Sequence, residues 1–321
     1  MTQTRAAQPD PASGPDAGRE SRREPDAAPA SRLAGVGLVL LGVFSVQIGA
    51  GVAKGLFPVA GPNGTVWLRL AFAAIPMAVL LWRPGRPLWS FRDLPDPAGA
   101  RRAVVLFGLV LGGMNWSFYQ ALARIPLGAA VAVEFLGPLT LALALSRRRL
   151  DVLWALAAGT GLVLLTLDPF SGAGLHLAPV GVALAALAGA LWACYVLLSR
   201  QVGRLVPGSR GLAWAFLVAL LVVTPTGIAA APRLLDGHVL LLGLVVAVLC
   251  SVVPYAAELE ALRRLPARVF GVLLSVEPAA AAIVGLLVLH ERLDLSRWSG
   301  VGLVCAASLG ATLTSRKTDA P

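Results

Sequence analysis

Long apolar stretches, separated by short basic segments, run from Leu33 to Ser315. Each stretch holds about 16–23 residues, and a helix of about 20 apolar residues spans the roughly 30 Å hydrocarbon core of a bilayer. The pattern therefore predicts an all-α protein with ten membrane-spanning helices, at Leu33–Ala53, Gly64–Trp82, Ala103–Ala121, Ile125–Ser146, Val152–Leu167, Pro179–Ser199, Leu212–Ala230, Val239–Ala261, Val269–Leu289 and Trp298–Ser315. Very short links join the third span to the fourth and the eighth to the ninth, which predicts two antiparallel helical hairpins.

Composition agrees with a membrane protein, because 57% of the 321 residues are hydrophobic and 14% are charged. Soluble domains carry roughly 45–50% apolar and about 25% charged residues. The net charge of +10 does not indicate nucleic-acid binding, since the basic residues lie between apolar spans and form no single patch. With the N-terminus inside, 21 Lys and Arg fall in inside segments and 5 in outside loops, the latter being Lys54, Arg124, Arg233, Arg292 and Arg297. This bias predicts that both termini are cytoplasmic.

The two halves of the chain resemble each other. The segment 119–126 matches 259–266 at an offset of 140, and Glu134 matches Glu277 at an offset of 143. Gly35, Val36 and Lys54 match Gly181, Val182 and Arg200 at an offset of 146. We expect a disordered cytoplasmic arm at 1–31, five-helix repeats at 32–168 and 178–315, and a cytoplasmic tail at 316–321. Because five is odd, the second repeat enters the membrane inverted, as is typical of secondary transporters. A duplication kept only for packing stays open as the alternative.

Two carboxyl groups are predicted near the middle of the bilayer, Glu134 in the fourth span and Glu277 in the ninth. A charged group there costs roughly 2.5–3.5 kcal/mol, so it usually faces a cavity or a partner. These groups could bind a substrate ammonium or carry protons, or each could form a structural hydrogen bond. Pro278 directly follows Glu277, so we expect the helix to break there.

Further polar side chains complete the candidate site. Arg69, inside the second span, could hold a substrate carboxylate, neutralise a glutamate, or reach toward the membrane interface. Glu258 lies on one helical face with Tyr255, Pro254 and Ser251, and this stripe is expected to line a cavity. The remaining candidates are Asn115 and Tyr119 on the third span and Gln47 on the first, each of which could instead join two helices.

No catalytic constellation accompanies these residues. The three histidines are scattered at span ends or in loops, and neither a zinc-protease pattern nor a phosphate-binding loop is present. Cys194, Cys250 and Cys305 have no metal-site spacing and are predicted to be small buried residues. We therefore expect no enzymatic activity, no cofactor and no metal.

The pattern resembles the drug/metabolite transporter superfamily, specifically proteins with two EamA-type domains, and within it the threonine and homoserine exporter branch. The matching segments are Lys54–Pro58, Trp67–Leu70, Pro126–Gly128, Glu134–Leu139, Pro254–Tyr255, Glu258–Leu262 and Arg268–Pro278. The resemblance covers about Leu33 to Ser315 and implies a central cavity and transport driven by the proton gradient or by solute exchange.

The expected function is therefore export of a small metabolite, most simply an amino acid, across the inner membrane by a secondary transporter that uses proton antiport. A carrier of drugs or nucleotide sugars is the alternative within the same fold, although phosphorylated substrates would favour several cavity-facing cations. An integral membrane enzyme or scaffold is a more remote alternative. Membrane lipid and the transported solute are the expected partners, and a homodimer stays open.

Overall fold

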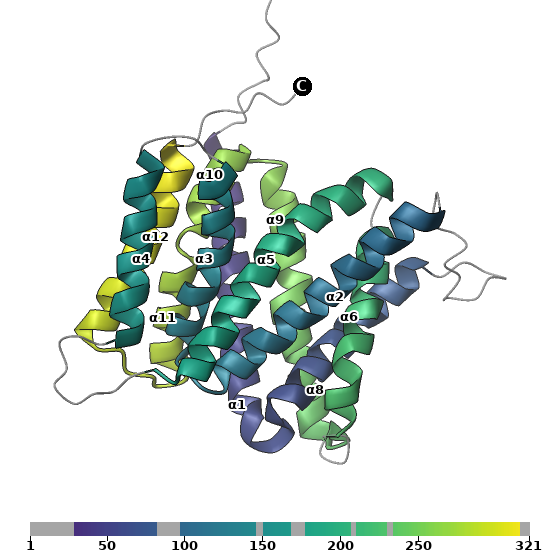
Figure 1. Ribbon diagram of the computed structural model, residues 1–321. Coiled ribbons are helices and arrows are strands. Elements are labelled where there is room, and N and C mark those ends of the chain that lie inside the picture. Colours follow the sequence, from purple (N-terminus) through teal and green to yellow (C-terminus); the bar gives the residue numbers. More distant parts are fainter. Residues whose placement is uncertain are drawn as a thin grey trace, which may run out of the picture.

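The computed structural model describes residues 29–81, 97–145, 150–167, 177–206, 210–229 and 234–314. All regular secondary structure in these residues is helical, and Figure 1 shows the helices standing side by side in one bundle. The elements are α1 (Pro29–Leu81), α2 (Pro97–Leu122), α3 (Leu127–Leu145), α4 (Leu150–Leu167), α5 (Pro179–Leu205), α6 (Arg210–Ile228), α8 (Gly237–Ala247), η2 (Val248–Val252), α9 (Val253–Leu262), α10 (Ala267–Leu274), α11 (Glu277–Val288) and α12 (Leu295–Thr314).

Helix α1 consists of two helical legs that meet at Gly61, where φ is 68° and ψ is 166°. This backbone conformation is essentially restricted to glycine. In Figure 1 the first leg descends, turns at the bottom of the molecule, and the second leg rises away from it. The predicted end of the first span at Ala53 is therefore wrong, because the helix continues to the bend and Lys54 lies on it.

Every predicted span overlaps a helical segment of the described residues. Seven of these helices are long and apolar enough to cross a membrane, with the whole of α1 taken as one, and Leu150–Thr166 is a shorter apolar helix. The predicted break at Glu277 is confirmed, since α10 ends at Leu274 and α11 begins at Glu277. Helix α1 begins at Pro29, inside the predicted arm, and the rest of that arm and the tail 316–321 lie outside the described residues.

Pairing of helices from the two halves of the chain builds the core. Helix α2 packs against α5 and α6, α3 packs against α5 and α11, and α4 packs against α12. Helices α3 and α5 touch backbone to backbone, because a Cβ at Gly137 would overlap Gly189 and a Cβ at Gly189 would overlap the carbonyl of Glu134. Small residues at such crossings allow close helix approach inside a membrane, where apolar burial does not drive association.

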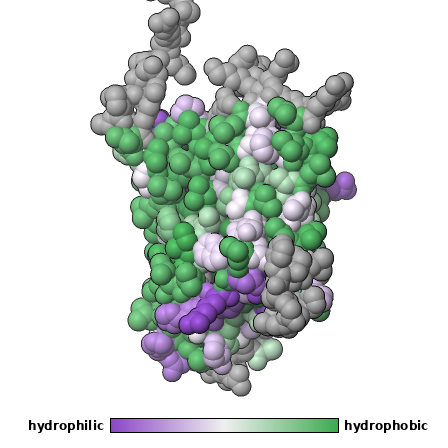
Figure 2. Space-filling view, turned by 90° about the vertical axis from the view of Figure 1, so that its left-hand side faces the viewer, coloured by the Kyte–Doolittle hydropathy of each residue, from purple (hydrophilic) through white to green (hydrophobic). Residues whose placement is uncertain are grey.

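The outside of the bundle is apolar. Figure 2 shows a broad hydrophobic surface on the side formed by α4 and α12, with hydrophilic residues gathered toward the lower end. Exposed side chains on α4 include Val152, Leu153 and Leu156, each more than half accessible. An apolar surface of this extent suits a lipid environment.

Candidate functional site

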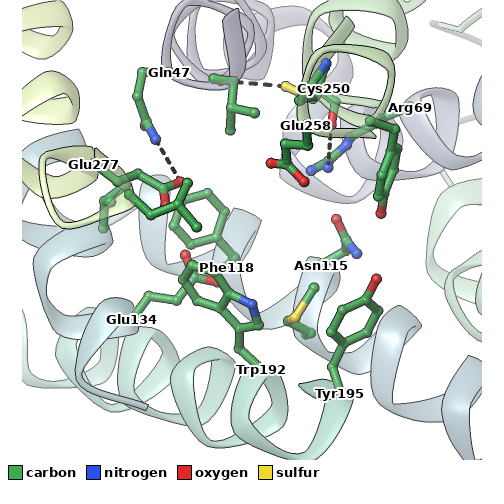
Figure 3. Close-up of a pocket in the computed structure, with 16 residues that line it drawn as sticks. Gln47, Arg69, Asn115, Phe118, Glu134, Trp192, Tyr195, Cys250, Glu258 and Glu277 are labelled. Carbon is green, nitrogen blue, oxygen red and sulfur yellow. Dashed lines mark hydrogen bonds between the residues drawn. The ribbon is translucent and has the colours of Figure 1, made fainter. Parts of the chain in front are cut away.

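A cavity of about 290 Å³ lies between the helices of the two halves (Figure 3). Its walls come from α1, α2 and α3 of the first half of the chain and from α5, η2, α9, α10 and α11 of the second. The lining residues are Val46, Gln47, Arg69, Met114, Asn115, Phe118, Val131, Glu134, Trp192, Tyr195, Cys250, Pro254, Tyr255, Glu258, Leu274 and Glu277.

Seven of the eight candidate side chains line this cavity, and Tyr119 does not. Tyr119 is fully buried beneath Arg69, with the guanidinium carbon 5.7 Å from the centre of its ring. Of the stripe on α9, Pro254, Tyr255 and Glu258 line the cavity, while Ser251 is buried outside it. The sequence thus located the polar wall, but it did not separate cavity-facing side chains from those packed behind them.

The two central carboxyl groups have different surroundings. Gln47, only 1% exposed, donates from Nε2 to Oε1 of Glu277 at 3.2 Å. Glu134 projects from the middle of α3, is 9% exposed, and has no side-chain hydrogen bond to another described residue. In Figure 3 both carboxyl groups lie on one side of the cavity and Arg69 lies on the other. One carboxyl group is therefore held by an amide while the other faces the cavity unbonded.

Arg69 brings an uncompensated positive charge to the opposite wall. One terminal nitrogen donates to the carbonyl oxygen of Cys250 at 3.2 Å. No carboxylate oxygen of the described residues lies within 4.0 Å of the guanidinium, and its Nε is buried without a hydrogen-bond partner there. Of the three roles left open for Arg69, reaching the membrane interface does not fit the structure, because its side chain lines the cavity. A guanidinium in this state is able to accept an anionic group in bidentate geometry.

Pro254 explains why the Cys250 carbonyl is available to Arg69. Proline has no backbone N–H, so it cannot donate to the carbonyl four residues earlier in an α-helix or five residues earlier in a π-helix. Those carbonyls belong to Cys250 and Leu249, and the chain forms a π-helix, η2, at this point. Arg69 binds the first, and the hydroxyl of Ser45 donates to the second at 2.8 Å.

Sequence reasoning missed the aromatic wall of the cavity. Trp192 and Tyr195 lie three residues apart on one face of α5, and Phe118 adds a third ring from α2. In an apolar span such rings resemble ordinary core or lipid-facing residues, and only their i, i+3 spacing pointed to a shared face. The cysteine prediction holds for Cys250, which is buried, but Cys194 is exposed.

The lower face of the molecule, defined by the Gly61 bend, the turn 122–127 and the link 288–295, is closed by an ion pair. Lys54 Nζ lies 2.6 Å from Glu291 Oε1 and also donates to the carbonyl of Ile125 at 2.8 Å. The backbone N–H of Leu127 donates to the other oxygen of Glu291 at 2.7 Å. We call this group the Lys54–Glu291 clasp. It joins α1, the α2–α3 turn and the α11–α12 link.

A second polar group lies near the same face. Asn63 Oδ1 accepts hydrogen bonds from Trp116 Nε1 at 3.0 Å and from Gln120 Nε2 at 2.7 Å. Lys54 follows the cavity residue Gln47 by seven residues, which at 1.5 Å per residue is about 10 Å along the helix. The cavity is therefore sealed toward the lower face by roughly two helical turns of packed structure.

Apolar helices gathered round a cavity that carries both acidic and basic groups define a membrane transporter of small solutes. The model of the EamA-like transporter family matches residues 179–313. The chain is 40% identical over 281 residues to the proteins named threonine/homoserine exporter RhtA of Escherichia coli (strain K12) and Salmonella typhimurium (strain LT2). The matched region covers 87% of this chain and 92% of each relative. The chain belongs to this exporter family, within the drug/metabolite transporter superfamily.

Family membership makes the chain a multi-pass inner-membrane transporter and not an enzyme. A crystal structure of a protein of unstated function is 20% identical and superposes with a TM-score of 0.53 over 91% of this chain and 99% of that one. At that identity the likeness shows the fold alone. Within the described residues no group of three metal-ligating side chains occurs.

Proposed function

We propose that the protein exports small zwitterionic amino acids, such as threonine and homoserine, from the cytoplasm by proton antiport. The observation that carries this proposal is the unpaired Arg69 guanidinium, which faces two carboxyl groups across one cavity. A zwitterion supplies an anion to the first and a cation to the second. The relatives' names as threonine/homoserine exporters support the same substrate class.

The cavity's size and charge favour an amino acid over larger solutes. Its volume of about 290 Å³ lies at the small end of the roughly 300–1,000 Å³ found for small-molecule pockets. Arg69 is the single Lys or Arg among the described residues that line it. A phosphorylated carrier substrate would need more positive charge, since each phosphate brings one to two negative charges.

Glu134 is the group assigned to the substrate ammonium. Its carboxyl group is free of side-chain hydrogen bonds within the described residues, whereas that of Glu277 is engaged by Gln47. A carboxylate that binds an ammonium must release any proton it carries, so substrate and proton compete for one site. That competition is the simplest physical basis for proton antiport in a cavity lined by three acidic residues, Glu134, Glu258 and Glu277.

The fold proposed for this transport is ten helices in two inverted repeats with both termini cytoplasmic. Six pairs of lining residues support it, because they stand at the repeat offsets of 140, 143 and 146: Val46 and Trp192, Met114 and Pro254, Asn115 and Tyr255, Phe118 and Glu258, Val131 and Leu274, and Glu134 and Glu277. Gly35 packs against Leu265, and Gly181 packs against Ile125. In the repeat Gly35 corresponds to Gly181, and Ile125 corresponds to Leu265. Reciprocal contacts of this kind are expected of two halves related by a pseudo-two-fold axis.

In this arrangement the lower face is periplasmic and the Lys54–Glu291 clasp holds it shut. Toward the opposite face the cavity side chains are more accessible, with Tyr255 38% exposed against 1% for Gln47. The structure then corresponds to a conformation loaded from the cytoplasm. Export requires the clasp to open while the cytoplasmic side closes.

The test is export of labelled threonine and homoserine from cells that express Glu134→Gln or Arg69→Met. Export by either variant is expected to fall to the level of cells without the protein, because each substitution removes one of the two charged groups that bind the zwitterion. Glu260→Gln is the matched control, since Glu260 lies outside the cavity and pairs with Arg264. Wild-type export by either cavity variant, at equal membrane abundance, would remove that residue from the mechanism.

A further inference from the structure

We infer that Tyr119 and Pro254 are positioning residues that hold Arg69 in place, and that through Arg69 they make the protein favour solutes that carry a carboxylate over those that lack one. The inference rests on the proposed function and deepens it. Neither residue needs to touch the substrate, and Tyr119 is not among the cavity-lining residues.

Tyr119 supports the guanidinium from below with its ring face. The 5.7 Å separation between Arg69 Cζ and the ring centroid is within the range in which a cation is attracted to an aromatic face. The ring is itself fixed, because Phe57 and Phe118 pack against it with centroid separations of 6.0 and 6.4 Å. Its hydroxyl is buried without a hydrogen-bond partner among the described residues. The contact of Arg69 with Tyr119 is therefore assigned to the ring face, over which the guanidinium lies.

Pro254 supplies the second contact, because it lacks the N–H that an α-helical residue at this position would donate to the Cys250 carbonyl. Arg69 lies on α1, and the carbonyl lies on η2 in the other half of the chain, 181 residues away. A residue with an N–H at position 254 would compete with Arg69 for this oxygen. The proline thus ties the cation of one half to the backbone of the other.

Both contacts orient the guanidinium without neutralising it. An aromatic face and a carbonyl oxygen carry only partial negative charge, whereas a carboxylate partner would cancel the full charge. Arg69 therefore stays available for a substrate carboxylate while its position is fixed in advance. Pre-organisation of this kind lowers the entropy lost when the substrate binds.

The experiment compares Tyr119→Leu with Tyr119→Phe in proteoliposomes, using labelled threonine as substrate and threoninol, the amino alcohol that lacks the carboxylate, as inhibitor. Tyr119→Leu removes the ring face and is expected to raise the threonine KM roughly tenfold, with the maximal rate within about twofold. Inhibition by threoninol is expected to be unchanged, because it does not use Arg69. Tyr119→Phe keeps the face and is expected to match the wild type.

Pro254→Ala is the second variant, and it tests the position of Arg69 independently in case Tyr119→Leu does not fold. It restores a backbone N–H and is expected to raise the threonine KM several-fold, again without an effect on threoninol. The inference is overturned if Tyr119→Leu equals Tyr119→Phe, or if the variants weaken threonine and threoninol alike. If the wild type itself moves neither threonine nor homoserine, the proposed function fails instead.

Discussion

The turns that close the two helical hairpins, 122–127 and 262–267, share a backbone but differ in what surrounds them. In the first, the N–H groups of Arg124 and Ile125 both donate to the carbonyl of Ala121. In the second, Arg264 and Leu265 donate to Ala261 in the same way. Each acceptor and donor is 140 residues from its counterpart, so the repeat preserves the turn down to its individual hydrogen bonds.

The partners of the two turns differ. The first turn receives Lys54 on the carbonyl of Ile125 and Glu291 on the N–H of Leu127. Among the described residues, the ion pairs of the second turn are local, from Arg263 and Arg264 to Glu260. Lys54 corresponds to Arg200 at the offset of 146, and Glu291 corresponds to Arg148 at the offset of 143. The counterparts of the Lys54–Glu291 pair in the sequence are therefore two arginines.

In the proposed repeat, this difference distinguishes the two faces of the molecule. The turn geometry comes from local sequence, and the ion pair at the lower face comes from α1 and the α11–α12 link. Two arginines carry the same charge and cannot form an ion pair with each other. In the proposed mechanism, charged residues present beside only one of the two turns determine which end of the cavity is closed.

Glu291→Lys is expected to have the largest effect, because it places two lysines together and leaves the Leu127 N–H without its acceptor. Breaking a largely buried ion pair typically costs about 3–5 kcal/mol, so export should fall by more than about tenfold. The measurement is labelled threonine export normalised to folded protein in the membrane. Arg292→Glu, a charge reversal at the exposed neighbouring position, is the control and should keep export near wild type.

The double variant Lys54→Glu/Glu291→Lys exchanges the two charges and tests whether the loss of export is due to the loss of the ion pair. Each single change should be severely impaired, and the double change should recover a substantial part of export, because the ion pair reforms in reverse. Recovery will be incomplete, since the reversed pair cannot reproduce the bonds to Ile125 and Leu127. A double variant no better than either single change would argue against the ion pair as the closing element.

The glycines against the two turns are expected to give an intermediate effect. A Cβ at Gly181 would lie 2.6 Å from Ile125 and 3.0 Å from Arg124, and one at Gly35 would lie 2.7 Å from Leu265. Alanine at either position should reduce folded abundance and thermal stability, and more so at Gly181, where two residues must move. Gly37→Ala, with nothing within 4 Å, should leave both unchanged.

The smallest effect is expected from Glu260→Gln, which removes the local ion pairs of the second turn. Exposed pairs of this kind contribute little to stability. Export should stay within about twofold of wild type, measured in the same cells as the clasp variants. A loss comparable to that of Glu291→Lys would mean that the second turn also carries a clasp, and the contrast between the two faces would disappear.

Much of this organisation was predictable from the sequence because apolar length, tight links and repeat offsets are local patterns. The break at Glu277 followed from Pro278, and the carboxyl groups followed from their position within the spans. The helical extension to Gly61 was not predictable, because a charged lysine normally marks the end of an apolar span and Pro58 normally interrupts a helix. The partner of Lys54 is Glu291, 237 residues later in the sequence, and this distant pairing leaves no local signal.

In the cavity, too, contacts between residues far apart in the sequence could not be predicted. Glu134, Glu277 and Arg69 were identifiable because charge is rare inside a membrane. Tyr119 was placed on the correct helical face, but its burial behind Arg69 depends on the packing of Phe57 and Phe118. The π-helix at Val248–Val252 left no sequence signal beyond Pro254, because its form depends on Ser45 and Arg69 from the other half.

Whether the lower face opens during export can be measured by linking it shut. Gly55 and Arg292, the exposed neighbours of the two clasp residues, are both replaced by cysteine in a chain that lacks Cys194, Cys250 and Cys305, and a bifunctional thiol reagent with a reducible linker joins the two positions. Threonine export is predicted to stop on linking and to return when a reductant cuts the linker. Undiminished export by the fully linked protein would contradict the proposal that substrate leaves through this face.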